Sequence, residues 1–391
     1  MPRLFLLAIL IAADVAPQCG STGSTTSSSD LNFVSITVNG GPTGDYLDGV
    51  FTSVTICVPG TSTCQTIDGI LVDTGSSGLR VVSSVLKLNL PQQTSGGAPL
   101  VECAQFQDGF TWGPLRAADV KLASKQASNI PIQVIGESDF SSIPDGCSST
   151  GTAENTVSDL SANGILGVGL YREDCGDACN RAGSNNPGFY YTCPSFGNCT
   201  VAQLDSSQQA QNPVWKFSTD NNGVVIQLPS VAPGGTTNVT GMMIFGIGTQ
   251  SNNALGSAHV LTVNAQGNIT TIFNGQSYTD TFIDSGSNGI FFLDAATTGM
   301  PTCSQSSDFY CPPTTKSFSA TQRGSNAVTS SFTFSIANSD RVPNNFFASA
   351  EIGGPNAGTF DWGLPFFFGR SIFVAIDGQG APGGNPPYWA Y

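Results

Sequence analysis

The chain has 391 residues, of which 39% are hydrophobic and 10% are charged, so it can bury a core large enough for about two domains. Its 27 acidic and 13 basic residues give a net charge of −14, which repels phosphate backbones, and we expect no nucleic-acid partner. The 46 glycines and 23 prolines, beside many serines and threonines, favour an all-β protein over a helical bundle.

The N-terminus is typical of an export signal. The apolar run 4–13 is too short to span a bilayer as a helix, and residues 1–19 are predicted to form a signal peptide. Cys19 precedes a Gly/Ser/Thr-rich tether, residues 20–30, as the acylated cysteine of bacterial lipoproteins does. Lipidation of Cys19 and simple secretion both stay open, because the two residues before it do not suit a lipidation signal. A lipid anchor would be the one expected membrane contact.

The other ten cysteines indicate five disulfides and an oxidising compartment, in agreement with export to the periplasm, the cell surface or the medium. Close spacing favours four local pairs, and the fifth pair follows by elimination. The predicted pairs are Cys57–Cys64, Cys175–Cys179, Cys193–Cys199, Cys303–Cys311 and Cys103–Cys147. Unequal spacing and the lack of a nearby histidine argue against zinc in the segment 175–199. We expect no metal and no cofactor.

Beyond the tether, short apolar or alternating segments separated by turn residues predict strands and no long helix. In chain order these segments are 33–39, 53–58, 65–73, 118–124, 130–136, 223–229, 242–247, 259–265 and 268–274. The one helix candidate is 200–211, which ends before Pro213. His259 is the one histidine, so a Ser-His-Asp hydrolase is hard to sustain.

Two segments 211 residues apart repeat one pattern, in which an apolar run is followed by Asp, Ser or Thr, Gly and Ser. They are LVDTGSSGLRV (71–81) and FIDSGSNGIFF (282–292), and their recurrence in each half of the chain indicates internal duplication. Burying a lone carboxylate is costly, but two carboxylates that face each other can share a proton. One can then act as a general base toward water and the other as a general acid. Asp73 and Asp284 are the predicted catalytic pair.

The three residues after each aspartate are predicted to support the pair. The residue directly after each aspartate is Thr or Ser, and its hydroxyl can form a hydrogen bond with the opposite loop. The glycine that follows permits a tight turn, and the next serine can hold the carboxylate by a hydrogen bond. These residues are Thr74, Gly75 and Ser76 in the first segment, and Ser285, Gly286 and Ser287 in the second.

With these motifs the chain resembles the pepsin-like aspartic peptidases, and among them a set of bacterial exported proteins of unassigned function. ANGILGVGL (162–170) looks like the hydrophobic-hydrophobic-Gly element beneath the first active-site loop of that family. FDWGLPFFFGRSIFVAID (360–377) is similar to the matching element of the second lobe, and MMIFGIGTQSNNAL (242–255) to the strand and turn that open that lobe. The order and spacing fit over about residues 31 to 378.

The resemblance implies a bilobal all-β fold, with two related β-barrel-like lobes on either side of a central cleft. We expect an N-terminal lobe over 31–215, a C-terminal lobe over 216–391, and a monomer. The implied function is an exported aspartic-type endopeptidase that acts on a peptide or protein substrate below neutral pH. The alternative is a catalytically silent pepsin-like surface protein that binds a peptide or protein in the same cleft.

The chain departs from the family pattern at the flap, the hairpin that closes over the substrate. In pepsins a tryptophan after the first motif usually bonds a flap tyrosine, whereas Arg80 stands in that region here. The expected flap, residues 104–120, has no tyrosine, and we expect Arg80 to meet Asp108 or the hairpin backbone. The aromatic residues that could close over a substrate are Phe106, Phe110 and Trp112.

Overall fold

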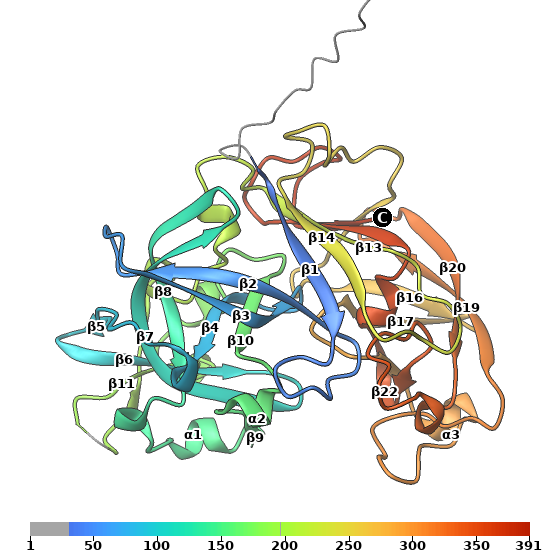
Figure 1. Ribbon diagram of the computed structural model, residues 1–391, viewed down its shortest axis with the longest axis horizontal. Coiled ribbons are helices and arrows are strands. Elements are labelled where there is room, and N and C mark those ends of the chain that lie inside the picture. Colours follow the sequence, from blue (N-terminus) through green and yellow to red (C-terminus); the bar gives the residue numbers. More distant parts are fainter. Residues whose placement is uncertain (1–30, 196) are drawn as a thin grey trace, which may run out of the picture.

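Strands dominate the structure, and this confirms the all-β class. The computed structural model describes residues 31–195 and 197–391, in which the α-helices α1 (Asp145–Ser148), α2 (Val157–Leu160) and α3 (Ala295–Thr298) have only four residues each (Figure 1). None of the helices in these ranges is long and apolar enough to span a membrane. The predicted signal peptide, Cys19 and the tether lie outside the described residues.

Within the described residues, strand pairing connects 17 strands in one network and 7 strands in a second. The first network contains β1 (Phe33–Asn39), β2 (Gly49–Cys57), β3 (Cys64–Asp73), β4 (Ser77–Val82), β5 (Thr94–Ser95), β6 (Ala98–Gln105), β7 (Gly109–Leu122), β8 (Lys125–Ile135), β9 (Thr152–Ala153), β10 (Gly164–Val168), β11 (Tyr190–Thr192), β12 (Thr200–Val201), β13 (Gly223–Leu228), β14 (Val239–Phe245), β15 (Val260–Thr262), β23 (Arg370–Ala375) and β24 (Tyr388–Ala390). The second contains β16 (Ile269–Phe273), β17 (Gln276–Ile283), β18 (Ile290–Leu293), β19 (Lys316–Arg323), β20 (Thr329–Ile336), β21 (Gly353–Gly354) and β22 (Asn356–Trp362).

The larger network joins distant parts of the chain. Strand β1 pairs with β2 on one side and with β14 on the other, from Phe33 opposite Ile244 to Val38 opposite Val239. Strand β13 in turn pairs with β14 and with β23. Figure 1 shows β1, β14 and β13 side by side in the middle of the molecule. The first strand of the chain therefore lies in a sheet with strands from its second half.

Two units of three strands share one arrangement. In the first, β10 pairs in parallel with β3 and antiparallel with β4; in the second, β22 pairs in parallel with β17 and antiparallel with β18. The facing residues are Val72, Leu166 and Leu79 in the first unit, and Ile283, Trp362 and Ile290 in the second. The residues paired with the middle strand are separated by the same number of positions in the sequence, because 283 − 72 and 290 − 79 both equal 211. The repeat found in the sequence thus extends to the register of the strands.

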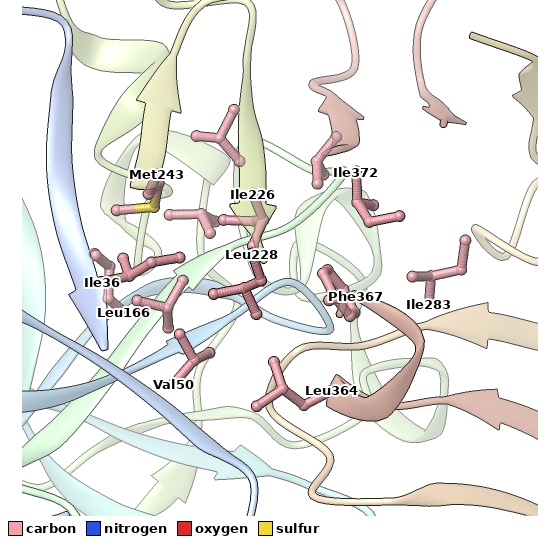
Figure 2. Close-up of a cluster of buried hydrophobic side chains, with 14 of the residues drawn as sticks. Ile36, Val50, Leu166, Ile226, Leu228, Met243, Ile283, Leu364, Phe367 and Ile372 are labelled. Atoms are coloured by element: carbon pink, nitrogen blue, oxygen red, sulfur yellow. The ribbon is translucent and has the colours of Figure 1, made fainter. Parts of the chain in front are cut away.

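A continuous apolar core supports both units. The outer part of β3 is largely exposed or partly buried, whereas residues 70–73 are all buried between β2 and β10. Figure 2 shows buried side chains contributed by strands of both networks. Its labelled residues are Ile36, Val50, Leu166, Ile226, Leu228, Met243, Ile283, Leu364, Phe367 and Ile372. Strands β3 and β17, which lead to the two aspartates, therefore rest on one core.

The five predicted disulfides are confirmed. The bonded pairs are Cys57–Cys64, Cys103–Cys147, Cys175–Cys179, Cys193–Cys199 and Cys303–Cys311. The first pair links the facing ends of β2 and β3, and it fixes the register of that hairpin. Several disulfides in one chain agree with an oxidising environment.

Replacing both Cys103 and Cys147 by alanine is expected to lower the free energy of unfolding by about 3 kcal/mol. This disulfide closes the longest loop of the five, 44 residues, so its removal gives the largest increase in the conformational entropy of the unfolded chain. Urea denaturation measures the effect. The double alanine variant of Cys175 and Cys179, which removes a loop of 4 residues, is the control and should lose less. An equal loss in the two variants would contradict the prediction.

The predicted helix over 200–211 is wrong. Residues 200–201 form β12, which pairs with β11, and residues 206–208 form a single 3₁₀ turn. The Cys193–Cys199 disulfide brings residue 200 back beside residue 192, and two β-branched residues there suit strand pairing. Tertiary pairing thus overrides a weak helical pattern.

Candidate functional site

Asp73 and Asp284 stand at the ends of equivalent strands. Asp73 is the last residue of β3, opposite Gly167 of β10, and its side chain is buried. Asp284 directly follows β17, is partly exposed, and donates its backbone N–H to the carbonyl of Trp362 at 3.1 Å. The repeated strand units therefore deliver one aspartate each to the same place.

The two carboxyl groups share one main-chain donor. The Gly75 N–H donates to Oδ1 of both Asp73 (2.7 Å) and Asp284 (3.1 Å). The Gly286 N–H donates to Oδ1 of Asp284 at 2.7 Å. The structure thus places the carboxyl groups close enough for the charge of Asp73 to disfavour ionisation of Asp284.

Glycine is required beside each aspartate because the opposite carboxyl group occupies the space of a side chain. A Cβ at Gly75 would lie 2.7 Å from Cγ of Asp284, and one at Gly286 would lie 2.8 Å from Oδ1 of Asp73. Neither glycine has a positive φ. The tight turn expected from the sequence is therefore not the reason for these glycines, which permit the close approach of the two loops.

Reciprocal hydrogen bonds join the two loops directly behind the aspartates. The N–H of Thr74 donates to Oγ of Ser285 at 3.1 Å, and the N–H of Ser285 donates to Oγ1 of Thr74 at 2.9 Å. The Ser285 hydroxyl donates to the carbonyl of Val72 (2.7 Å), and the Thr74 hydroxyl to the carbonyl of Ile283 (3.3 Å). Each hydroxyl thus bonds across to the opposite loop, which holds the pair in register.

Two serines hold the outer oxygens of the pair. The Ser76 hydroxyl donates to Oδ2 of Asp73, and the Ser287 hydroxyl donates to Oδ2 of Asp284 at 2.8 Å. Burial and the neighbouring Asp73 raise the pKa of Asp284 well above its usual range. The raised pKa favours the protonated form of Asp284. Such a pair can act as acid and base together.

Arg80 is buried behind the loop of Asp73 and does not line a cleft. Its guanidinium donates from Nη2 to Glu102 at 2.7 Å and to Asp174 at 3.1 Å, and from Nη1 to the carbonyl of Ser77 at 3.1 Å. The expected contact of Arg80 with Asp108 or with the backbone of residues 104–120 is wrong, because its polar partners are Glu102 of β6, Asp174 and the carbonyl of Ser77. The guanidinium lies 5.7 Å from the ring of Phe106, at the turn of the β6–β7 hairpin.

Two of the three hairpin aromatics are unavailable to a substrate. Phe110 and Trp112 are each 2% exposed, so the prediction that either closes over a substrate is wrong. Trp112 packs edge-on against Tyr191 at 5.3 Å and donates its indole N–H to the carbonyl of Phe140 at 2.7 Å. These contacts form a small core beneath the hairpin. Phe106 is partly exposed.

A family model described as "Protein of unknown function (DUF3443)" matches residues 28–391. The chain belongs to this family. A comparison with curated proteins found no match. The match to the DUF3443 family covers both aspartates, both strand units and all five disulfides.

Two ionisable residues of the DUF3443 chain near the pair were missed from the sequence. Tyr46 lies in the β1–β2 loop, and burial together with the charges of Asp108 and Asp284 raises its pKa. Nothing in its sequence surroundings could have pointed to this placement. Asp361 lies on β22 between Phe360 and Trp362, so a carboxylate within an apolar strand was the signal for it.

The loop that carries Tyr46 is fastened to the second half of the chain. Oδ1 of Asp48 accepts the N–H of Ser349 at 2.7 Å, and the N–H of Asp48 donates to the carbonyl of Phe347 at 2.9 Å. Because both bonds lie within two residues of Tyr46, they limit how far its ring can move from the pair.

One group of possible metal ligands is present among the described residues. It consists of Cys303, Cys311 and Asp340. The two cysteines form a disulfide with each other, so they offer no thiolate to a cation. This group is not a candidate metal site.

Replacing Ser285 by alanine is expected to lower the free energy of unfolding by about 2 kcal/mol, because it leaves the buried Thr74 N–H and the carbonyl of Val72 unpaired. Urea denaturation measures the loss. Ser331→Ala is the control, since Ser331 shares an exposed hydroxyl contact with Thr321 and should change stability by less than about 0.5 kcal/mol. If the two variants lose equal stability, the reciprocal bonds do not hold the loops.

Proposed function

We propose that this chain is an exported aspartic-type endopeptidase with a bilobal, pepsin-like fold. The observation that carries the proposal is the Gly75 N–H that Asp73 and Asp284 both accept, each aspartate being presented by an equivalent strand unit and held by a serine hydroxyl. A structural role alone does not require two carboxyl groups on one donor, because placing two like charges so close is costly unless one of them is protonated.

The proposed reaction is hydrolysis of a peptide bond by water held between the two carboxyl groups. Asp73 takes a proton from the water while the water oxygen attacks the carbonyl carbon, and Asp284 gives its proton to the carbonyl oxygen. The resulting tetrahedral diol breaks at the C–N bond as Asp73 passes its proton to the leaving nitrogen. Asp284 recovers a proton from a diol hydroxyl, so the pair ends in its starting state. The main-chain donors at Gly75 and Gly286 hold the carboxyl groups in place throughout.

The proposed lobes are residues 31–215 and 216–391, with the pair in a cleft between them. The shared register of the two strand units and the cross-bonded loops support this division. Export agrees with the five disulfides, and a peptide or protein is the proposed substrate.

A catalytically silent protein that binds a peptide is the second candidate, and the hairpin favours it. Phe110 and Trp112 are buried, and residues 104–120 contain no tyrosine that could hydrogen-bond a substrate. Tyr46 is the phenol near the pair, and it comes from a different loop.

Incubation of the full chain with a diverse peptide mixture between about pH 3 and pH 7 tests the proposal, with mass spectrometry of the products. We expect cleavage that is strongest at acid pH, where Asp284 is protonated, and that falls as the pH rises through its pKa. Absence of cleavage at every pH would reject the peptidase. Peptide binding that persists under those conditions would then favour the silent binder.

A further inference from the structure

Among the described residues, β20 is the one long strand that pairs with a neighbour on a single side. It lies at the end of the network of 7 strands, beside β19. Within the same residues, the other strands with a single partner are β5, β9, β12, β15 and β21. Each of these has two or three residues, whereas β20 has eight. The fold therefore keeps these other edges short and leaves one long edge.

The free edge of β20 meets no other main chain in the described part of the protein. Among those residues, 329–336 form no main-chain hydrogen bond outside the pairing with β19. Figure 1 shows the β19–β20 hairpin at the outer margin of the molecule. Every second residue of an edge strand directs its N–H and C=O away from the sheet. These groups are available to a further strand.

The edge also lacks the features with which proteins protect an exposed strand, which are charged residues, proline and β-bulges. Its sequence, TSSFTFSI, contains no charged residue, no proline and no glycine. It pairs with β19 over eight consecutive residues without a shift of register. Its β-branched and aromatic residues favour the strand conformation. A regular edge of this kind can accept an extended chain by main-chain hydrogen bonds.

The two faces of the hairpin offer different groups to such a chain. On the inner face, the ring of Phe334 lies 5.4 Å from that of Phe318, and the ring of Phe332 lies 4.9 Å from that of Trp362. These rings are packed within the chain itself. The outer face carries hydroxyls on facing residues of the two strands, which are Ser317 and Ser335, Ser319 and Thr333, and Thr321 and Ser331. A partner strand would therefore meet main-chain groups and hydroxyls and would not need to cover exposed rings.

The segment that contains β20 has no negative charge, although the whole chain has a net charge of −14. No acidic residue occurs between Asp308 and Asp340, and the charged residues of this stretch are Lys316 and Arg323, both on β19. Two copies of so acidic a chain repel each other over most of their surface. At β20 this repulsion is weakest, because the edge itself is uncharged. A second copy can thus approach here at the least electrostatic cost.

We propose that β20 pairs in antiparallel orientation with β20 of a second copy of the chain, which joins the two smaller networks into one sheet. A two-fold axis makes such a contact self-complementary. Residues that face each other in antiparallel strands share a face of the sheet, so hydroxyl residues meet hydroxyl residues on the outer side. With Phe332 on the axis, each Ser331 faces a Thr333, a pair that suits cross-strand hydrogen bonding. This dimer does not depend on the proposed peptidase activity.

Sedimentation of the full chain over about a 100-fold range of concentration tests the dimer. We expect the mass of two chains at the upper end and of one chain at the lower end. Thr333→Lys places a cation of each copy at the contact and should raise the dissociation constant about tenfold or more. Ser319→Lys is the matched control, because Ser319 faces Thr333 on the same exposed face but lies on β19, and it should leave the dissociation constant unchanged. The mass of one chain at every concentration overturns the proposal and agrees with the monomer expected from the sequence.

Amide hydrogen exchange shows whether β20 is the strand involved. The amides of residues 329–336 that face away from β19 should exchange about tenfold or more slowly where the dimer forms, and should exchange fast again in Thr333→Lys at the same concentration. A dimer whose β20 amides exchange as fast as those of the single chain overturns this contact. Fast exchange at every concentration leaves the edge open to a strand of another protein and also overturns pairing with a second copy.

Discussion

Replacing Asp284 or Asp73 by asparagine is expected to reduce peptide hydrolysis by about 10³-fold or more. Each variant leaves one titratable carboxyl group, so no proton can be shared, and either the acid or the base of the proposed reaction is missing. Asparagine keeps the size of aspartate and an oxygen that can accept the glycine N–H. The loss should therefore appear in kcat, measured on a peptide that the unaltered chain cleaves.

Matched variants separate loss of chemistry from loss of fold. Asp68→Asn on β3 and Asp280→Asn on β17 alter exposed aspartates on the same two strands, and both should keep full activity. The raised pKa of Asp284 means that its stabilising contribution is present at acid pH and is lost as pH rises through the folded-state pKa. Asp284→Asn should thus unfold at a higher temperature than the unaltered chain at pH 7, but not at pH 4. Hydrolysis within tenfold of the unaltered rate in either active-pair variant would contradict the proposed mechanism.

Replacing Arg80 by methionine is expected to lower the free energy of unfolding by about 4 kcal/mol at neutral pH. Glu102 and Asp174 are 0% and 5% exposed, and without the guanidinium they remain buried as like charges. Burial and Glu102 raise the pKa of Asp174, so protonation at acid pH should remove part of the repulsion and reduce the deficit. Urea denaturation at pH 7 and pH 4 measures both effects.

Arg116→Met is the control for Arg80. Arg116 pairs with Glu137 where the two side chains are 18% and 22% exposed, and its replacement should cost about 1 kcal/mol with little dependence on pH. Equal losses in the two variants would show that the buried network around Arg80 carries no special stability. The comparison also bears on the site, since Arg80 holds the carbonyl of Ser77 directly beside the loop of Asp73.

Features set by short stretches of sequence could be predicted. Four disulfides close loops of 4 to 8 residues, so spacing alone suggested their pairing. The repeated motif pointed to Asp73 and Asp284 because each ends an apolar strand. The repeat also predicted the hydrogen bonds between Thr74 and Ser285, because these two residues occupy equivalent positions in the two motifs.

Features set by distant packing could not be predicted. The partners of Arg80 come from β6 and from the loop after β10, and nothing in either segment indicates that they meet. The sequence of β7 does not show which face of the strand other residues pack against. Phe110 and Trp112 are therefore predicted to lie in a cleft, whereas they form part of a buried cluster. The glycines were explained by turn geometry because the position of the opposite carboxyl group was unknown.

The pairing of β1 with β14 has a consequence for the order of folding. Strand β1 pairs with a strand that contains residue 244, and β13 pairs with β23, which ends at residue 375. The central sheet can therefore form completely only when almost the whole chain has been synthesised. Contacts this distant in sequence make folding slow. The four local disulfides do not depend on these distant pairings, and they can form in hairpins and turns before the central sheet is complete. The local loops can therefore be oxidised before the two aspartates meet.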